Sequence, residues 1–136
     1  MRLIYDILHF LRNVWKWRRI LWDDKDFDYG YLYDMLQFKL ENMYVNCING
    51  YTENKGEYRY MKIASDLIEI VKDELYVQEA YANFPDDIKP DEDFLTWLNT
   101  PNPKRNAAME VAYKQQEKAK RLLFKIIYEK IDYWWD

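Results

Sequence analysis

Apolar side chains recur every three or four residues along most of this chain, and few helix-breaking residues interrupt them. That spacing marks one face of an α-helix, whereas the residues of a half-buried strand would alternate with a period of two. The 136 residues include only three glycines and four prolines, too few for the tight turns of a β-sandwich or barrel. The spacing therefore predicts an all-α fold.

Four long helices follow from the apolar stripes and the turn signals between them. They are expected at about residues 2–22, 28–47, 57–82 and 106–134. The turn signal "NGYTENKG" ends the second helix, and Asn106 is expected to be the N-cap of the last. The broad apolar face of the third helix indicates a central position with two neighbours. Short early connections predict an antiparallel bundle, with 1–136 forming a single helical domain.

The prolines are concentrated in one long acidic connection between the third helix and the last. All four lie in residues 83–105, where a single helical turn from Phe94 to Leu98 is expected. A connection of this length in a small domain is usually functional or mobile.

Charge is distributed unevenly along the sequence. The formal net charge is −4, which argues against nucleic acid as the main partner, because phosphate neutralisation supplies most of that affinity. Residues 1–22 nevertheless hold five basic side chains against Asp6, whereas residues 23–34 and 86–93 hold five acids each against one lysine. The sequence therefore predicts one basic segment and two acidic ones.

The acidic turn that follows the first helix resembles part of a calcium loop. Asp24, Asp26 and Asp28 occupy the first three ligand positions of that motif. Its sixth position is Tyr29 instead of glycine and its twelfth is Met35 instead of glutamate, so the sharp turn and the bidentate ligand are missing. The turn is interpreted as the N-cap of the second helix, with no metal site. An alternative is that residues 23–28 fold back onto the preceding arginines and organise a site for an anion.

The segment "WKWRRILW" (15–22) interleaves tryptophans with cations. Rings and guanidiniums in this order suit stacking on a base with phosphate contacts, and equally a membrane-surface helix or a partner groove. They also suit ordinary packing with a solvated basic face. At helical spacing Trp15 and Trp22 share one side while Trp17 points elsewhere. We take Trp15, Trp17, Arg18 and Arg19 as candidate ligand-binding residues.

The chain ends on "YWWD", which adds two more candidates, Tyr133 and Trp135. Trp134 continues the apolar stripe of the last helix and is predicted to be a core residue. Trp135 points about 100° away on a helix, so it needs another partner. A second subunit, the first predicted helix of its own chain or a ligand would cover it. An exposed terminal tryptophan favours a homo-oligomer.

The sequence lacks the residues that several kinds of catalytic and metal site require. One histidine and one cysteine supply neither a zinc site nor a histidine-based triad. No phosphate-binding glycine loop or nucleophile elbow occurs in the sequence, so no catalytic residue, metal or cofactor is predicted. Asp6 and His9 interrupt the first apolar segment, which argues against a signal peptide. No segment is long and apolar enough for a membrane span. The lone Cys47 suits a reducing cytoplasm.

Two motifs resemble those of small helical proteins from bacteriophage genomes. Residues 22–28 match the pattern W-x-D-x-D-[WF]-D, and Leu36, Lys39, Leu40 and Met43 match L-x-x-K-L-x-x-M in the helix that follows. The helix "YMKIASDLIEIVKDELY" and the closing Trp-Trp-Asp are also similar to theirs. The resemblance implies a phage origin and brings no catalytic motif with it.

Phage accessory proteins of this size commonly obstruct a host defence system. The expected function is therefore a non-enzymatic phage protein that sequesters a nucleotide-type defence signal in a homo-oligomer. The alternative is a protein-interaction module that blocks a host defence protein through its acidic surfaces, 23–28 and 86–93. In both cases the expected location is the cytoplasm of the bacterial host.

Overall fold

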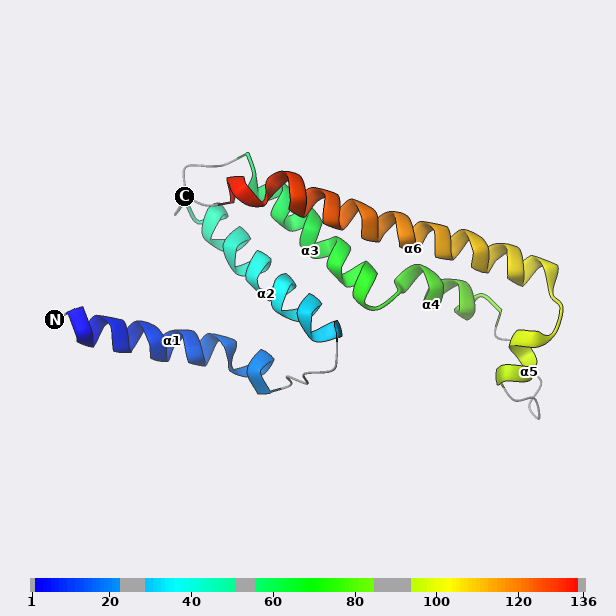
Figure 1. The fold of residues 1–136 in the computed structure, drawn as a ribbon, viewed down its shortest axis with the longest axis horizontal. Coiled ribbons are helices and arrows are strands. Elements are labelled where there is room, and N and C mark those ends of the chain that lie inside the picture. Colours follow the sequence, from blue (N-terminus) through cyan, green and yellow to red (C-terminus); the bar gives the residue numbers. More distant parts are fainter. Residues whose placement is uncertain (1, 23–28, 51–55, 85–93, 135–136) are drawn as a thin grey trace.

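The structure is a computed structural model that describes residues 2–22, 29–50, 56–84 and 94–134 (Figure 1). The helices are α1 (Arg2–Trp22), α2 (Tyr29–Ile48), α3 (Tyr58–Lys72), α4 (Leu75–Ala82), α5 (Phe94–Asn99) and α6 (Pro103–Lys130), followed by the 3₁₀ turn η2 (Ile131–Tyr133). The described residues include no strand. The predicted all-α helical bundle is confirmed.

α3 occupies the centre of the bundle, between α2 and α6, and runs antiparallel to both (Figure 1). Leu40 of α2, Ile68 of α3 and Leu123 of α6 are the largest fully buried side chains, at 2%, 0% and 0% exposure. Trp134, just beyond η2, is 7% exposed and joins the same cluster. The predictions of a central third helix and a core Trp134 are confirmed.

The third predicted helix, 57–82, is two helices in the structure. α3 ends at Lys72 and α4 begins at Leu75, because Glu74 adopts a left-handed backbone conformation with φ of 49°. A left-handed residue cannot continue a right-handed helix, and a glutamate there gives no sequence signal of a break. The break redirects the chain so that α4 packs on α6. The contact between α4 and α6 forms a second apolar cluster, which consists of Val77, Ala80, Met109 and Ala112.

The last predicted helix, 106–134, begins earlier and ends earlier than expected. Asn102 is its N-cap in place of Asn106, because the Asn102 side chain accepts a hydrogen bond from the backbone N–H of Arg105 at 3.0 Å. Pro103 then takes the first helical position, where its missing N–H costs nothing. The α-helix ends at Lys130, and η2 completes the turn before Trp134.

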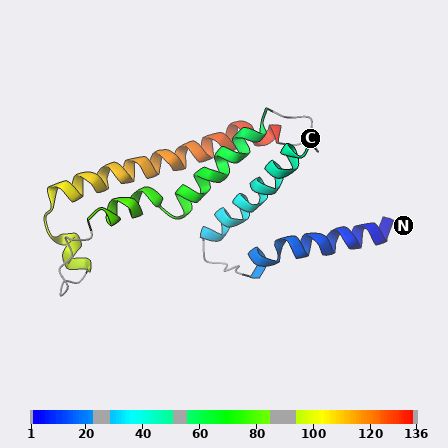
Figure 2. The ribbon, with the colours of Figure 1, turned by 180° about the vertical axis from the view of Figure 1, so that it is seen from behind.

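α1 stands apart from the central helices. Figures 1 and 2 show it extending beside the start of α2, with the other helices on one side of it. None of its side chains is buried. Only Asn13, Trp17 and Ile20 are partly covered, and all its other residues are exposed. The tertiary structure therefore leaves the apolar stripe of α1 outside the core.

Candidate functional site

The contact between α1 and α2 uses only one side of α1. The rings of Trp17 and Phe38 meet edge to face, with centroids 4.7 Å apart. The partly covered residues Asn13, Trp17 and Ile20 follow one another at helical spacing, so this side faces α2. The sequence prediction that Trp17 points away from Trp15 and Trp22 is confirmed, because the latter two are 67% and 89% exposed.

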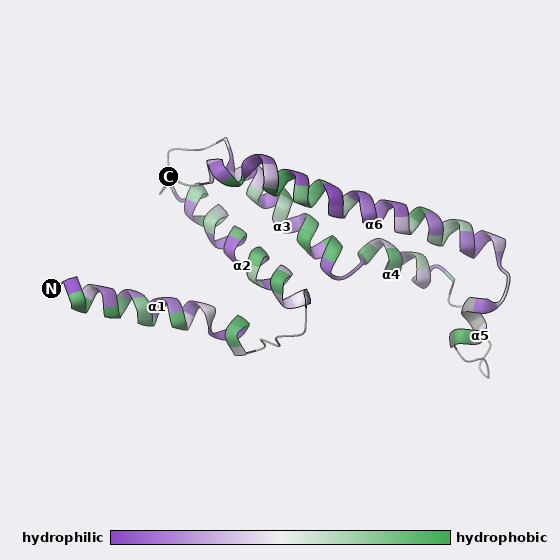
Figure 3. Cartoon of the chain, viewed as in Figure 1, coloured by the Kyte–Doolittle hydropathy of each residue, from purple (hydrophilic) through white to green (hydrophobic). Residues whose placement is uncertain are grey.

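The opposite side of α1 is an uncovered apolar surface, here called the α1 face. It is defined by eight side chains that are each 41–72% exposed: Leu3, Ile4, Ile7, Leu8, Phe10, Leu11, Val14 and Trp15. Hydropathy colouring shows these apolar bands repeating along the helix (Figure 3). A contiguous apolar surface of this kind marks an interaction site on a soluble protein.

Arg18 is held against the α1 face by its neighbour Trp15. Its guanidinium carbon lies 3.9 Å from the centroid of the Trp15 ring, and Nη1 donates a hydrogen bond to the Trp15 carbonyl at 2.7 Å. Both residues remain exposed. This stacking holds a cation and an aromatic ring side by side on the surface. The sequence of residues 15–22 predicted that a ligand would meet such a pair.

A cleft of about 350 Å³ lies between α1 and α2. Its lining residues are Lys16, Arg19 and Ile20 of α1 with Tyr31, Asp34, Gln37, Phe38 and Glu41 of α2. Partial burial, and then the positive charges of Lys39 and Arg12, lower the pKa of Lys16 from its ordinary value. The cleft therefore concentrates positive charge along its α1 side.

The acidic side of the cleft is already engaged by the bundle. Asp34 accepts a hydrogen bond from Lys72 at 2.8 Å, and Ser65 donates one to Glu41 at 3.3 Å. The hydrogen bond to Asp34 raises the pKa of Lys72 above its ordinary value. These bonds orient the α2 carboxylates toward α3, while Lys16 and Arg19 line the α1 side of the cleft.

Tyr133 belongs to a different part of the molecule. It is 59% exposed and lies in η2, next to Lys130, whose Nζ is 5.9 Å from the Tyr133 ring and 4.3 Å from that of Tyr60. Lys130 also forms an ion pair with Glu57 at 3.6 Å. This group lies at the start of α3, beside the C-terminal end of α2, whereas Arg19 lies beside its N-terminal half (Figure 1).

The structure therefore separates the two predicted groups of ligand-binding residues. Trp15 and Arg18 lie together on the α1 face, whereas Trp17 and Arg19 lie toward α2. Tyr133 is not near either pair. Trp135 lies outside the described residues, as do the acidic segments 23–28 and 86–93 with their expected cap and surfaces. Within one subunit a site that uses both groups does not form from the described residues.

One pocket was missed by sequence reasoning. It has a volume of about 280 Å³ and joins α2, the α3–α4 break and α6 through Tyr29, Tyr33, Glu74, Tyr113 and Gln116, among others. The Gln116 amide nitrogen donates to the carbonyls of Ile70 and Val71, and its buried Oε1 has no hydrogen-bond partner. The pocket joins residues distant in the sequence with Glu74, whose left-handed backbone no sequence pattern signals.

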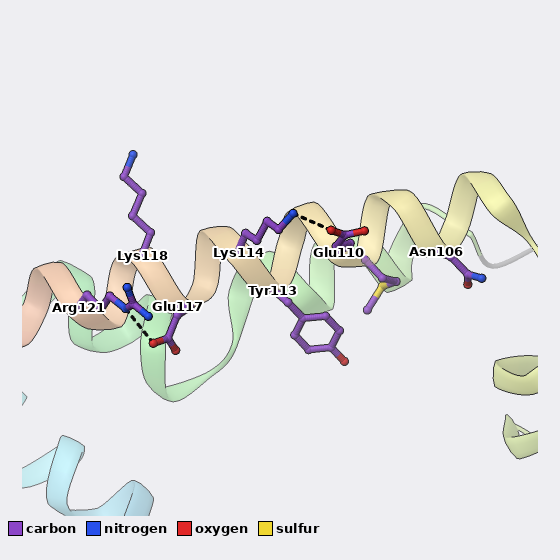
Figure 4. A pocket seen from close by; sticks show the side chains of 8 residues that line it. Asn106, Glu110, Tyr113, Lys114, Glu117, Lys118 and Arg121 are labelled. Atoms are coloured by element: carbon purple, nitrogen blue, oxygen red, sulfur yellow. Dashed lines mark hydrogen bonds and ion pairs between the residues drawn. The ribbon is translucent and has the colours of Figure 1, made fainter.

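A hollow of about 710 Å³ runs along α6 alone (Figure 4). Four of its charged side chains are paired, since Lys114 binds Glu110 at 2.6 Å and Arg121 binds Glu117 at 3.1 Å. Lys118 and Tyr113 point to opposite sides of the helix in Figure 4. A surface without converging groups is a weaker candidate than the α1 face, despite its size.

Among the described residues, no group of three histidine, cysteine or carboxylate side chains is arranged to hold a metal ion. None of the described helices has the length and apolar character needed to cross a membrane. Comparisons with protein families, curated proteins and solved structures found no match to this chain.

Proposed function

We propose that this chain is a non-enzymatic binding protein and that the α1 face is its binding surface. One observation carries the proposal: eight apolar side chains along four turns of α1 are exposed, while α2 packs on the other side of the helix. Covering one such side chain contributes about 1.5–3 kcal/mol when burial is complete. A partner that covers the α1 face would gain several such contributions.

The experiment compares the chain with two double variants at matched exposure. Ile7→Glu/Leu11→Glu places charges on the α1 face, at side chains 48% and 55% exposed. Val111→Glu/Leu122→Glu does the same on α6, at 55% and 44% exposure. All three proteins should unfold at similar temperatures, because neither pair is part of the buried core. Only the α1 variant should lose the partner molecules that copurify with the unaltered chain. Native mass spectrometry and lipid extraction measure these molecules.

Two results would contradict the proposal. The α1 variant could unfold well below the α6 variant, which would mean that the α1 face is buried within the chain. Alternatively, the retained molecules could be the same for all three proteins, which would mean that the α1 face binds nothing.

The nucleotide-type ligand is a second candidate, favoured by the cationic cleft between α1 and α2. Lys16 and Arg19 line this cleft beside Phe38, which packs on Trp17. A base on the exposed rings with phosphate on these cations would suit sequestration of a defence signal. Titration with ADP-ribose and with cyclic dinucleotides should change tryptophan emission, and Lys16→Ala/Arg19→Ala should abolish the change. No change with any of these nucleotides rejects this candidate.

The phage context remains part of the proposal. The resemblance suggests that the binding event obstructs a host defence in the cytoplasm of an infected cell. The expected homo-oligomer would arise if a second copy covers the α1 face, and the interaction module would arise if a host defence protein covers it. The oligomeric state and the retained partner distinguish these cases in the same native mass spectra.

A further inference from the structure

We infer that α1 lies along the surface of an anionic lipid bilayer, with the α1 face in the lipid and its cations at the headgroups. This inference rests on the proposed function, because it names the partner of the same surface. The shape of the α1 face, the position of the bundle and the distribution of charge each support it.

The α1 face is broad, and its breadth suits a plane better than another helix. Its residues occupy four positions in every seven, at residues 3, 4, 7, 8, 10, 11, 14 and 15, and span an arc of roughly 160° around the helix. A partner helix in a coiled coil covers only the narrow seam of two positions in seven. A lipid surface covers about half the circumference of a helix that lies flat on it.

The bundle is attached on the side that stays in water. Asn13, Trp17 and Ile20, which face α2, lie on the far side of α1 from the centre of the α1 face. In Figures 1 and 2, which view the molecule from front and back, the other helices lie to one side of α1. The contact with α2 therefore leaves the eight side chains of the α1 face exposed and open to a bilayer.

Charge selects an anionic surface. Arg12 and Arg19 lie along one edge of the α1 face, where the cations of an interfacial helix meet headgroups. Lys16 lies farther round the helix and lines the cleft toward α2. Arg18 lies within the arc, stacked on Trp15. In a helix–helix seam this guanidinium would be buried, whereas at a lipid surface its long side chain reaches the phosphates.

The charge balance also disfavours pairing of α1 with α1 from a second copy. Residues 2–22 carry five basic side chains and one acid, so two such helices would each bring a charge of +4. Because the whole chain carries −4, the remainder carries −8. Repulsion between that remainder and anionic lipid is screened, since the thickness of α1, about 10 Å, exceeds the Debye length of about 8 Å at physiological salt.

The test uses the full chain with vesicles of phosphatidylcholine alone and of phosphatidylcholine with phosphatidylglycerol. Co-sedimentation should show binding to the mixed vesicles on the order of 100-fold tighter than to the neutral ones, and tryptophan emission should shift to shorter wavelength. Arg12→Ala/Arg18→Ala/Arg19→Ala should remove most of this preference. Ile7→Glu/Leu11→Glu should abolish binding, whereas the α6 control, Val111→Glu/Leu122→Glu, should bind like the unaltered chain.

Three results would overturn the inference. They are no binding to the mixed vesicles, equal binding to both vesicle types, and equal binding by the α1 and α6 double variants. If the unaltered chain ignores vesicles but forms an oligomer that Ile7→Glu/Leu11→Glu converts to a monomer, the partner is a second copy. The lipid inference then fails, while the proposed function of the α1 face stands.

Discussion

Replacing one leucine at a time by alanine should separate the core of this protein from its binding surface. Leu123 is 0% exposed between α6 and α3, whereas Leu11 on the α1 face is 55% exposed. Both substitutions remove the same atoms, so only the surroundings differ. Leu123→Ala should lower the free energy of unfolding by about 3 kcal/mol, through lost burial and the cavity left behind. Leu11→Ala should lower it by less than about 0.5 kcal/mol.

Urea unfolding followed by circular dichroism measures both values in the same way. The transition midpoint should fall markedly for Leu123→Ala and stay close to the unaltered chain for Leu11→Ala, with similar slopes. Low protein concentration without lipid keeps partners of α1 from adding their own contribution. Equal losses of stability for the two variants would contradict this prediction, because they would show that Leu11 is as buried as Leu123 in the folded chain.

Three further predictions concern caps, backbone and pH. Asn102→Ala should lower the free energy of unfolding by about 1 kcal/mol, since the bond to the Arg105 N–H is lost; an unchanged urea midpoint contradicts this. Glu74→Gly should raise it by roughly 0.5–1 kcal/mol, because glycine adopts positive φ freely; a lower melting temperature would show that Glu74 is needed there. The hydrogen bond to Asp34 raises the pKa of Lys72. The interaction between the two residues therefore contributes fully to stability below the ordinary lysine pKa, and this contribution is lost as pH rises through the raised pKa. Lys72→Met should therefore lower the free energy of unfolding at neutral pH and reduce the loss of stability at alkaline pH. If urea titrations show the same alkaline loss for the variant and the unaltered chain, the prediction is wrong.

The candidate site was partly predictable. Helical spacing alone placed Trp15 and Trp22 on one side and Trp17 on another, and the structure confirms it. The same spacing could not say which side faces α2. α2 takes the side of Trp17, because an aromatic edge contact with Phe38 is available there. The separation of Tyr133 from α1 also needed the structure, because it depends on how the helices are arranged.

Apolar spacing and composition, which act locally along the chain, were enough to predict that the chain is helical, that its third predicted helix is central and that Trp134 is buried. Where the helices break and which of their faces are covered depends on the tertiary structure. Glu74 interrupts a continuous apolar pattern through its backbone conformation, which no residue type signals. The α1 face carries the same periodicity as the core helices, yet it is exposed. The helical spacing of apolar residues shows that one face of a helix is apolar. What covers that face depends on residues distant in the sequence, or on another molecule.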